Sequence, residues 1–178
     1  MKTNILRSNG TWALLLGVLL LWGGAARAEL AAVACVGTTD TRYQPGLKNT
    51  EQLAKFTGDA SLRCTGVPFL LLTPASIHTE GQAPLSCDLS LFSPVRSRFV
   101  IQWGDGTTST AEAEPIVNEK QGGQFVLVVR GKVVEGRFPG ALVTRTLISP
   151  TLDLNVCDSP QGVTRAEGLA SLEVVSLP

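Results

Sequence analysis

Prolines constrain this chain more than any other feature of its sequence. Ten of them lie between Pro45 and Pro178, and their spacing leaves little room for a long helix, because proline removes a backbone donor and clashes with the preceding helical turn. Between them, short runs rich in Thr, Val and Ser alternate polar and apolar residues and end at Gly or Pro. This pattern is typical of strands in a sandwich or a barrel, so we expect an all-β chain.

The predicted strands are joined by short connections, among them Pro45-Gly46, Gly104-Asp105-Gly106 and Gly122-Gly123. We predict an antiparallel β-sandwich of immunoglobulin-like type. A small closed β-barrel is the alternative, because the number of strands does not separate the two architectures. The expected strands are 33–43, 51–64, 68–72, 77–91, 98–103, 107–116, 124–134, 141–148 and 166–175.

Two strands carry unusual apolar residues. The run FVLVV at 125–129 is apolar on both faces, which predicts a central strand covered on both sides. Trp103 ends the predicted strand 98–103, and a tryptophan in an otherwise apolar strand is more often part of the core than a binding platform. We therefore expect Trp103 to be buried.

The N-terminal segment has the pattern of a secretory signal peptide. Lys2 and Arg7 precede an uncharged apolar run at 12–22, and Ala-Arg-Ala at 26–28 is a typical cleavage site. The run is shorter than the roughly 20 residues of a membrane-spanning helix, so no membrane span is expected. We predict that residues 1–28 are a signal peptide and that residues 29–178 form one β-sandwich domain. The product would be secreted, with retention in a periplasm or cell wall as alternatives.

The charge balance excludes one class of function. Without residues 1–28 the chain has 12 basic and 15 acidic residues, a formal net charge of −3. Nucleic-acid-binding domains usually carry a basic surface, so we expect no nucleic-acid partner.

All four cysteines, Cys35, Cys64, Cys87 and Cys157, follow the predicted cleavage site. An even number of cysteines in an exported chain predicts two disulfides, and the sequence leaves three pairings open. The spacings contain no C-x-x-C pattern for zinc or redox chemistry. The alternative is a lipoprotein that begins at an acylated Cys35, which would leave an odd number of thiols.

Catalytic candidates are few. After residue 28 the chain has a single histidine, His78, so a nucleophile–histidine arrangement depends on it alone, and its setting is that of a surface residue. No spacing singles out a catalytic pair of carboxylates, and Glu112 and Glu114 share one strand face that we expect to be solvated. No cofactor or metal site is predicted; calcium at Asp105 or near Asp153 and Asp158 is the weak exception. Glu119 and Glu135 are further acidic residues that could belong to a catalytic carboxylate pair.

The stretch from Trp103 to Thr110 (WGDGTTST) predicts a hairpin, because glycine supplies positive φ and aspartate bonds its own backbone. It resembles part of the W-D-F-G-D-G-T-x-S hairpin of PKD domains, which are extracellular immunoglobulin-like modules. A broader pattern resembles a group of small secreted proteins of actinobacteria, and this resemblance implies export, two disulfides and a β-rich fold but no activity. Its elements are C-V-G-T at 35–38, Y-Q-P-G-L at 43–47, Ser86-Cys87, the hairpin, Cys157 and G-V-T at 162–164.

An exported β domain with few catalytic side chains predicts a non-catalytic binding module for a cell-surface polysaccharide or a protein. An exposed pair of Tyr43 and Trp103 would favour stacking on a glycan. One alternative is a structural envelope or matrix component that associates through a sheet edge. The other is a hydrolase that uses His78, or an enzyme inhibitor that presents the segment 64–87 if those two cysteines are bonded. The candidate recognition residues are Tyr43, Arg96, Arg98, Asp105 and Arg137.

Overall fold

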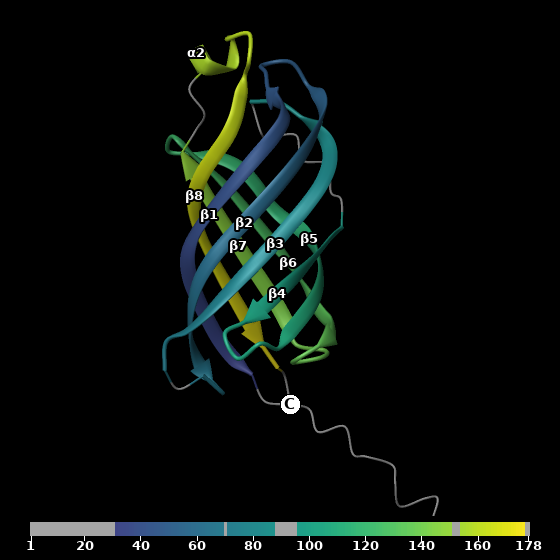
Figure 1. The fold of residues 1–178 in the computed structure, drawn as a ribbon, viewed down its shortest axis with the longest axis vertical. Helices are drawn as coiled ribbons and strands as arrows, with labels where there is room; N and C mark the ends of the chain where they lie inside the picture. The colour runs from purple at the N-terminus through teal and green to yellow at the C-terminus, as the bar shows by residue number, and fades with distance from the viewer. Residues whose placement is uncertain (1–30, 70, 88–95, 151–153, 177–178) are drawn as a thin grey trace, which may run out of the picture.

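The protein is a closed, eight-stranded antiparallel β-barrel in a computed structural model (Figure 1). Each strand pairs with the next along the chain, and β8 pairs with β1 to close the barrel. The structure describes residues 31–69, 71–87, 96–150 and 154–176. The elements are β1 Ala32–Leu47, β2 Gln52–Val67, β3 Thr73–Leu85, β4 Ser97–Trp103, β5 Thr108–Gln121, β6 Gln124–Gly136, β7 Leu142–Pro150, α2 Leu154–Cys157 and β8 Val163–Val175.

The prediction of an immunoglobulin-like sandwich for residues 29–178 is therefore wrong, and the alternative, a small closed barrel, is confirmed. The all-β class, the antiparallel pairing and the two disulfides are also confirmed. The two architectures differ in strand order and in closure: a sandwich divides its strands between two sheets, whereas here one sheet follows the order of the chain and closes on itself. In the barrel, β1 and β8 run side by side from Ala32–Val175 to Arg42–Arg165, so neither strand is left as a free edge.

Strand alternation sorts side chains between the barrel interior and solvent. In β4, Phe99, Ile101 and Trp103 are buried, whereas Val100 and Gln102 are exposed between them. In β6, however, the expectation of a strand covered on both sides is wrong. Phe125 and Val129 are buried inside the barrel, while the outward-facing valines between them are only partly buried, because they lie on the outside of the wall.

Close strand contacts around the barrel depend on glycine. A Cβ atom at Gly37 would lie 1.9 Å from the Ser61 carbonyl oxygen, and one at Gly131 would lie 1.8 Å from the Glu112 carbonyl oxygen. Any side chain at these two positions would force the neighbouring strands apart. Glycines within strands allow the bending that closes a barrel.

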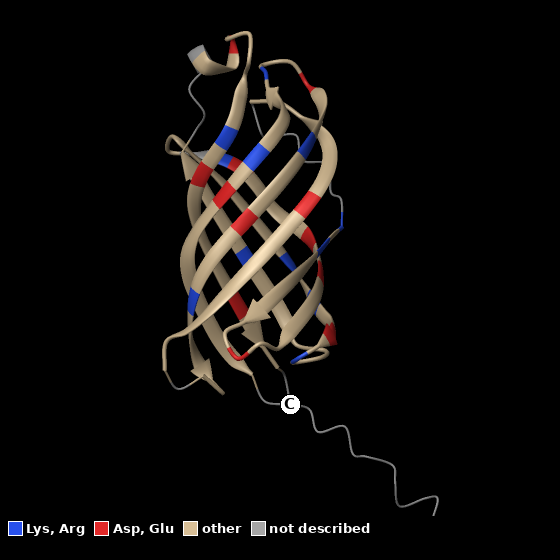
Figure 2. Ribbon diagram, in the orientation of Figure 1, with Lys and Arg blue, Asp and Glu red and all other residues tan. Residues whose placement is uncertain are grey.

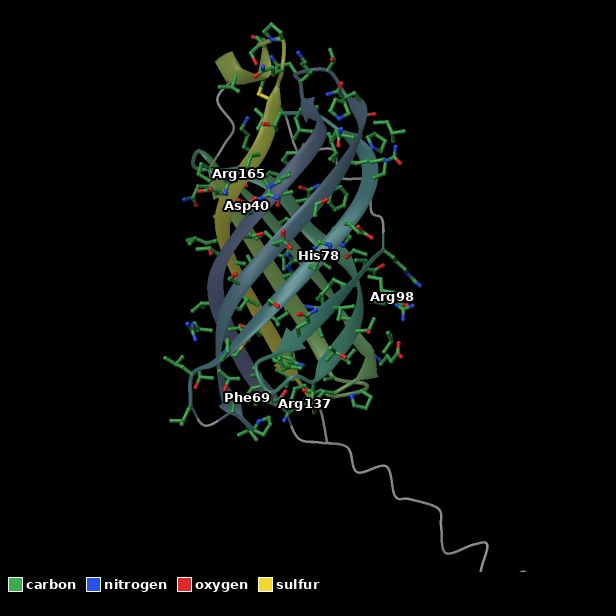
Figure 3. The ribbon with its side chains drawn as sticks, in the orientation of Figure 1. Asp40, Phe69, His78, Arg98, Arg137 and Arg165 are labelled. Carbon is green, nitrogen blue, oxygen red and sulfur yellow. A yellow bond between two sulfur atoms is a disulfide. The ribbon has the colours of Figure 1, made fainter. Side chains whose placement is uncertain are left out.

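One end of the barrel is closed by an aromatic cluster. The ring centroid of Trp103 lies 5.3 Å from that of Phe69 and 5.6 Å from that of Phe138. The guanidinium of Arg137 covers both phenylalanines, with its Cζ atom 4.7 Å from each ring centroid. Figure 3 shows Phe69 and Arg137 together at this lower end. Trp103 is 3% exposed, which confirms that it belongs to the core.

The opposite end is closed by a smaller apolar cluster that contains Leu47, Leu85, Phe125 and Val163. The disulfide Cys87–Cys157 lies in this cluster and joins the end of β3 to α2. Lys48, which follows β1, donates hydrogen bonds to the carbonyl oxygens of Ser159 and Pro160 at 2.6 and 2.7 Å. These contacts hold the chain before β8 across the upper end, where Figure 1 shows α2.

The second disulfide joins Cys35 and Cys64, which lie directly opposite each other on β1 and β2 and are both buried. Because the Cys35 sulfur is bonded to Cys64, it is not free for the thioether that a lipoprotein would need. Cys64 and Cys87 are in different bridges, so the inhibitor loop that required their bonding is excluded. The predicted signal peptide, residues 1–28, lies outside the described residues.

Most predicted strands correspond to observed ones, with three differences in the connections. Pro45-Gly46 was expected to be a turn, but both residues lie within β1. The expected strand at 68–72 is not a strand in the residues described there, and β3 ends at Leu85, with 88–95 outside the described residues. The hairpin at 104–106 and the turn at 122–123 are confirmed.

Candidate functional site

The barrel contains a cavity of about 410 Å³ that is partly open to the surface, and Phe125 of the smaller apolar cluster is one of its lining residues. This volume falls within the roughly 300–1,000 Å³ range of small-molecule sites. Its apolar lining comes mainly from Phe56 of β2, from β6 and from Leu147 of β7. The lining residues of β6 are Phe125, Leu127 and Val129.

The cavity exists because one side of the barrel places small residues inward. Thr39 and Thr41 of β1, Gly58 of β2, and Gly81 and Ala83 of β3 all line it. At the Cys35–Cys64 end, by contrast, the inward positions of β3 and β4 carry larger side chains, including Ile77, Phe99 and Ile101. A change in side-chain size along the same strands therefore gives a packed half and a hollow half.

Arg145 of β7 is the principal polar group in this cavity. It is 5% exposed, and its Nη1 donates a hydrogen bond to Thr79 Oγ1 at 3.1 Å. Its Cζ lies 5.5 Å from the ring centroid of Phe99. Within the described chain, Nε has no hydrogen-bond partner and no carboxylate forms an ion pair with the guanidinium. Burial lowers the pKa of Arg145 to about 10, so the group is still a cation at neutral pH.

Two hydroxyl groups add to the polar lining. Thr39 is 8% exposed, and its buried Oγ1 has no hydrogen-bond partner among the residues that the structure describes. Tyr43 lies further along β1, and burial raises the pKa of its phenol to about 12, which keeps it neutral. A buried polar atom without a partner is costly, so Thr39 Oγ1 and Arg145 Nε are two positions where a ligand atom would be favoured.

The cavity reaches the surface where strand pairing stops. β3 pairs with β4 only from Ala75 to His78, and exposed residues line the cavity beyond that point: Glu80, Gln82, Arg96 and Arg98. On the other side, β7 pairs with β8 only as far as Ile148, and the exposed Glu167 lines the cavity nearby. Arg98 is 3.3 Å from Glu135 and 3.9 Å from Glu112, and Glu167 is 2.8 Å from Arg165.

The predicted recognition residues do not form one site. Tyr43 lines the cavity, and Arg96 and Arg98 are at its rim. Asp105 instead forms an ion pair with Arg137, which Figure 3 shows at the aromatic end. Hydrogen bonds from the Thr107 side chain and backbone, and then the charge of Arg137, lower the pKa of Asp105. Asp105 therefore stabilises the β4–β5 hairpin.

The condition for glycan stacking, an exposed pair of Tyr43 and Trp103, is not met, because Trp103 is buried at one end of the barrel and Tyr43 lines the cavity. Aromatic stacking needs two exposed ring faces, which this arrangement does not offer. Glu112 and Glu114 are both exposed, as expected of a solvated strand face.

His78 lies on the outer face of β3, where 54% of its side chain is exposed (Figure 3). Its Nδ1 is 2.7 Å from Asp59 Oδ1, and this hydrogen bond raises the pKa of His78. The pair is outside the cavity, so a hydrolase that combines His78 with an enclosed substrate is not supported. No group of three or more potential metal ligands occurs among the described residues, and Asp153 lies outside them.

Charged residues are scattered over the outside of the barrel rather than gathered in one patch, as Figure 2 shows for the visible face. In the part of the chain that is described, no helix has the length and apolar character needed to cross a bilayer. Comparisons with family models, with curated proteins and with solved structures give no match.

Sequence reasoning missed Arg145 and Thr39. The spacing of residues along the strand could have identified Arg145. Arg145 is two residues from Val143 and two from Leu147, so all three side chains lie on the same strand face. An arginine between apolar residues on the inward face indicates a buried charge.

Proposed function

We propose that this protein is exported and binds a small, largely apolar molecule inside its barrel without catalysing a reaction. The observation that carries the proposal is the cavity of about 410 Å³ inside the barrel. Its apolar wall is made of aromatic and aliphatic side chains, Arg145 and Thr39 are buried polar residues in it, and charged residues are exposed where it opens to the surface. Ligand sites in proteins have this composition. The predicted signal peptide and the two disulfides support export.

We infer that recognition takes place in the barrel interior, where the cavity lies. A polysaccharide or a protein surface does not fit a cavity of about 410 Å³, so a small molecule is the better candidate. The structural alternative, association through a sheet edge, is weakened because β1 and β8 pair with each other along most of their length.

Binding can be tested with the neutral fluorophore 1-aminonaphthalene, whose emission shifts to the blue in an apolar environment. Ala83→Phe and Ala166→Phe would each place a phenyl group in the cavity, because both alanines line it. Ala34→Phe is the matched control, since Ala34 is exposed on the outside of β1. We expect both cavity variants to bind the fluorophore at least about tenfold more weakly, a loss of about 1.4 kcal/mol.

Circular dichroism would first establish that the three variants are folded. Equal affinity of wild type, both cavity variants and the control would place the fluorophore elsewhere and overturn the proposal.

A further inference from the structure

Arg145 is a charge that the barrel buries without neutralising. It belongs to a central part of β7 and is 5% exposed, and among the described residues its one hydrogen bond goes to the neutral hydroxyl of Thr79. Buried charges in proteins are normally paired, because taking a cation out of water is costly. An anion bound beside the Arg145 guanidinium would therefore be favourable.

The other charged residues around the cavity do not provide this anion. Glu80 and Glu167 line the same cavity, but both are exposed at its rim and neither forms an ion pair with Arg145. Phe99 offers its ring face, which stabilises a cation more weakly than a carboxylate does. An anionic partner for Arg145 must come from outside the described chain.

The surroundings of Arg145 restrict the ligand further. A planar guanidinium matches the two oxygens of a carboxylate, and the unpartnered Thr39 Oγ1 in the same cavity can donate one more hydrogen bond. A phosphate carries about −1.5 to −2 charges, which one buried cation does not balance. The nearest further cations, Arg96 and Arg98, are at the exposed rim.

The volume sets the size of the apolar part. At roughly 30 Å³ per non-hydrogen atom, the share of one water molecule in the liquid, a cavity of about 410 Å³ holds about 14 atoms. A head group at Arg145 leaves the remainder for a hydrocarbon chain against Phe56, Phe125 and Leu127.

We propose that the ligand is a medium-chain carboxylic acid, bound as its anion, with the carboxylate on Arg145 and the chain along the apolar wall. This inference rests on the proposed function and names the ligand class of the same cavity. Decanoate has the required head group and is smaller than the limit set by the volume. 1-Decanol has the same chain without the charge.

The test is calorimetric titration of the delipidated, disulfide-bonded protein with decanoate and with 1-decanol. Arg145→Met removes the charge and keeps a long side chain, and Arg145→Lys keeps the charge but loses the guanidinium fork. Arg130→Met is the control, because Arg130 is exposed on the outside of β6. We expect decanoate to bind Arg145→Met about 10- to 100-fold more weakly than wild type, with an intermediate loss for Arg145→Lys and none for Arg130→Met.

The affinity for 1-decanol should stay within about threefold in all four proteins, because the alcohol makes no charge contact. A second readout is ¹³C NMR of decanoate labelled at the carboxyl carbon. In wild type the bound carboxylate should stay ionised to lower pH than the free acid, and Arg145→Met should abolish this difference.

The outcomes separate this inference from the proposed function. If the fluorophore binds inside the barrel but decanoate does not, or if Arg145→Met binds decanoate as wild type does, the carboxylate assignment is wrong and the binding function stands. If the fluorophore, decanoate and 1-decanol all fail to bind, both proposals are wrong.

Discussion

Arg145→Met should make the unliganded protein more stable while it removes ligand affinity. The reason is that the folded state holds this guanidinium in a cavity where none of the described residues is its counter-ion, whereas the unfolded chain hydrates it fully. Methionine has a long, flexible and apolar side chain, so it fills much of the same space without a charge. A residue that serves only stability would show the opposite behaviour.

The size of the gain follows from the environment of the charge. Burial lowers the pKa of Arg145 from its ordinary value to about 10, which corresponds to about 3 kcal/mol against the charged folded state. The hydrogen bond to Thr79 and the contact with Phe99 offset this cost by about 1.5 and about 0.5 kcal/mol. We therefore expect the free energy of unfolding to rise by about 1 kcal/mol.

The destabilisation caused by the buried charge of Arg145 depends on pH. Below a pH of about 10 the arginine is charged in both the folded and the unfolded state, so the full cost is present at neutral pH. As pH rises above the folded-state pKa, the folded protein releases the proton and the cost begins to fall, and it is lost completely only above the higher pKa of the unfolded chain. The measurement therefore belongs at neutral pH.

Urea unfolding at neutral pH, followed by the fluorescence of the buried Trp103, measures this change. Arg130→Met, on the outer surface, should change the free energy by less than about 0.5 kcal/mol. A loss of 2 kcal/mol or more in Arg145→Met, with an unchanged dependence on urea, would refute the reasoning. It would mean that the protein itself already compensates the charge.

Three further predictions concern stability. Replacing both cysteines of the Cys87–Cys157 bridge with alanine should lower the free energy of unfolding by about 4 kcal/mol, against about 3.5 kcal/mol for the Cys35–Cys64 bridge, because the first bridge closes the longer loop. Equal or reversed losses in thermal unfolding would contradict this ranking. NMR titration should give His78 a pKa above 6.5 that falls in Asp59→Asn. The His78–Asp59 interaction stabilises the fold fully below the pKa of His78 in the unfolded chain, and this stabilisation is lost as pH rises through the pKa of His78 in the folded protein. An unshifted pKa of His78 would contradict the interaction. Ser109→Ala should lower the free energy of unfolding by about 1–3 kcal/mol, because Ser109 Oγ accepts a hydrogen bond from the buried Trp103 indole at 2.8 Å. Little change in urea unfolding would show that the indole N–H has another partner.

Much of the fold was predictable from local patterns. Alternation and turn residues placed strands near their observed positions, and the glycines at 104 and 106 marked a real hairpin. Barrel closure was only the alternative prediction, because it depends on the pairing of β1 with β8, which are at opposite ends of the chain. The disulfide pairing was equally inaccessible, since it follows from which strands become neighbours.

The sequence did contain evidence for closure that strand counting ignores. Gly37 and Gly131 lie within strands whose neighbours approach so closely that a Cβ atom would meet a backbone carbonyl. Glycine is disfavoured in strand interiors unless the backbone must bend or be approached closely. Its presence in the middle of several strands favours a strongly coiled sheet, and hence a barrel, over a flatter sandwich.

The site was missed for a different reason. Strand alternation identifies inward positions only when one face is clearly apolar, and around Arg145 the sequence Val-Thr-Arg-Thr-Leu places threonines on the opposite face. An arginine there is usually assigned to solvent, because charged residues are almost never fully buried without a partner. The same rule, applied to the structure, is what makes Arg145 informative. A charge that the protein buries and leaves unpaired lowers its stability, so its retention is best explained by an anion that binds beside it.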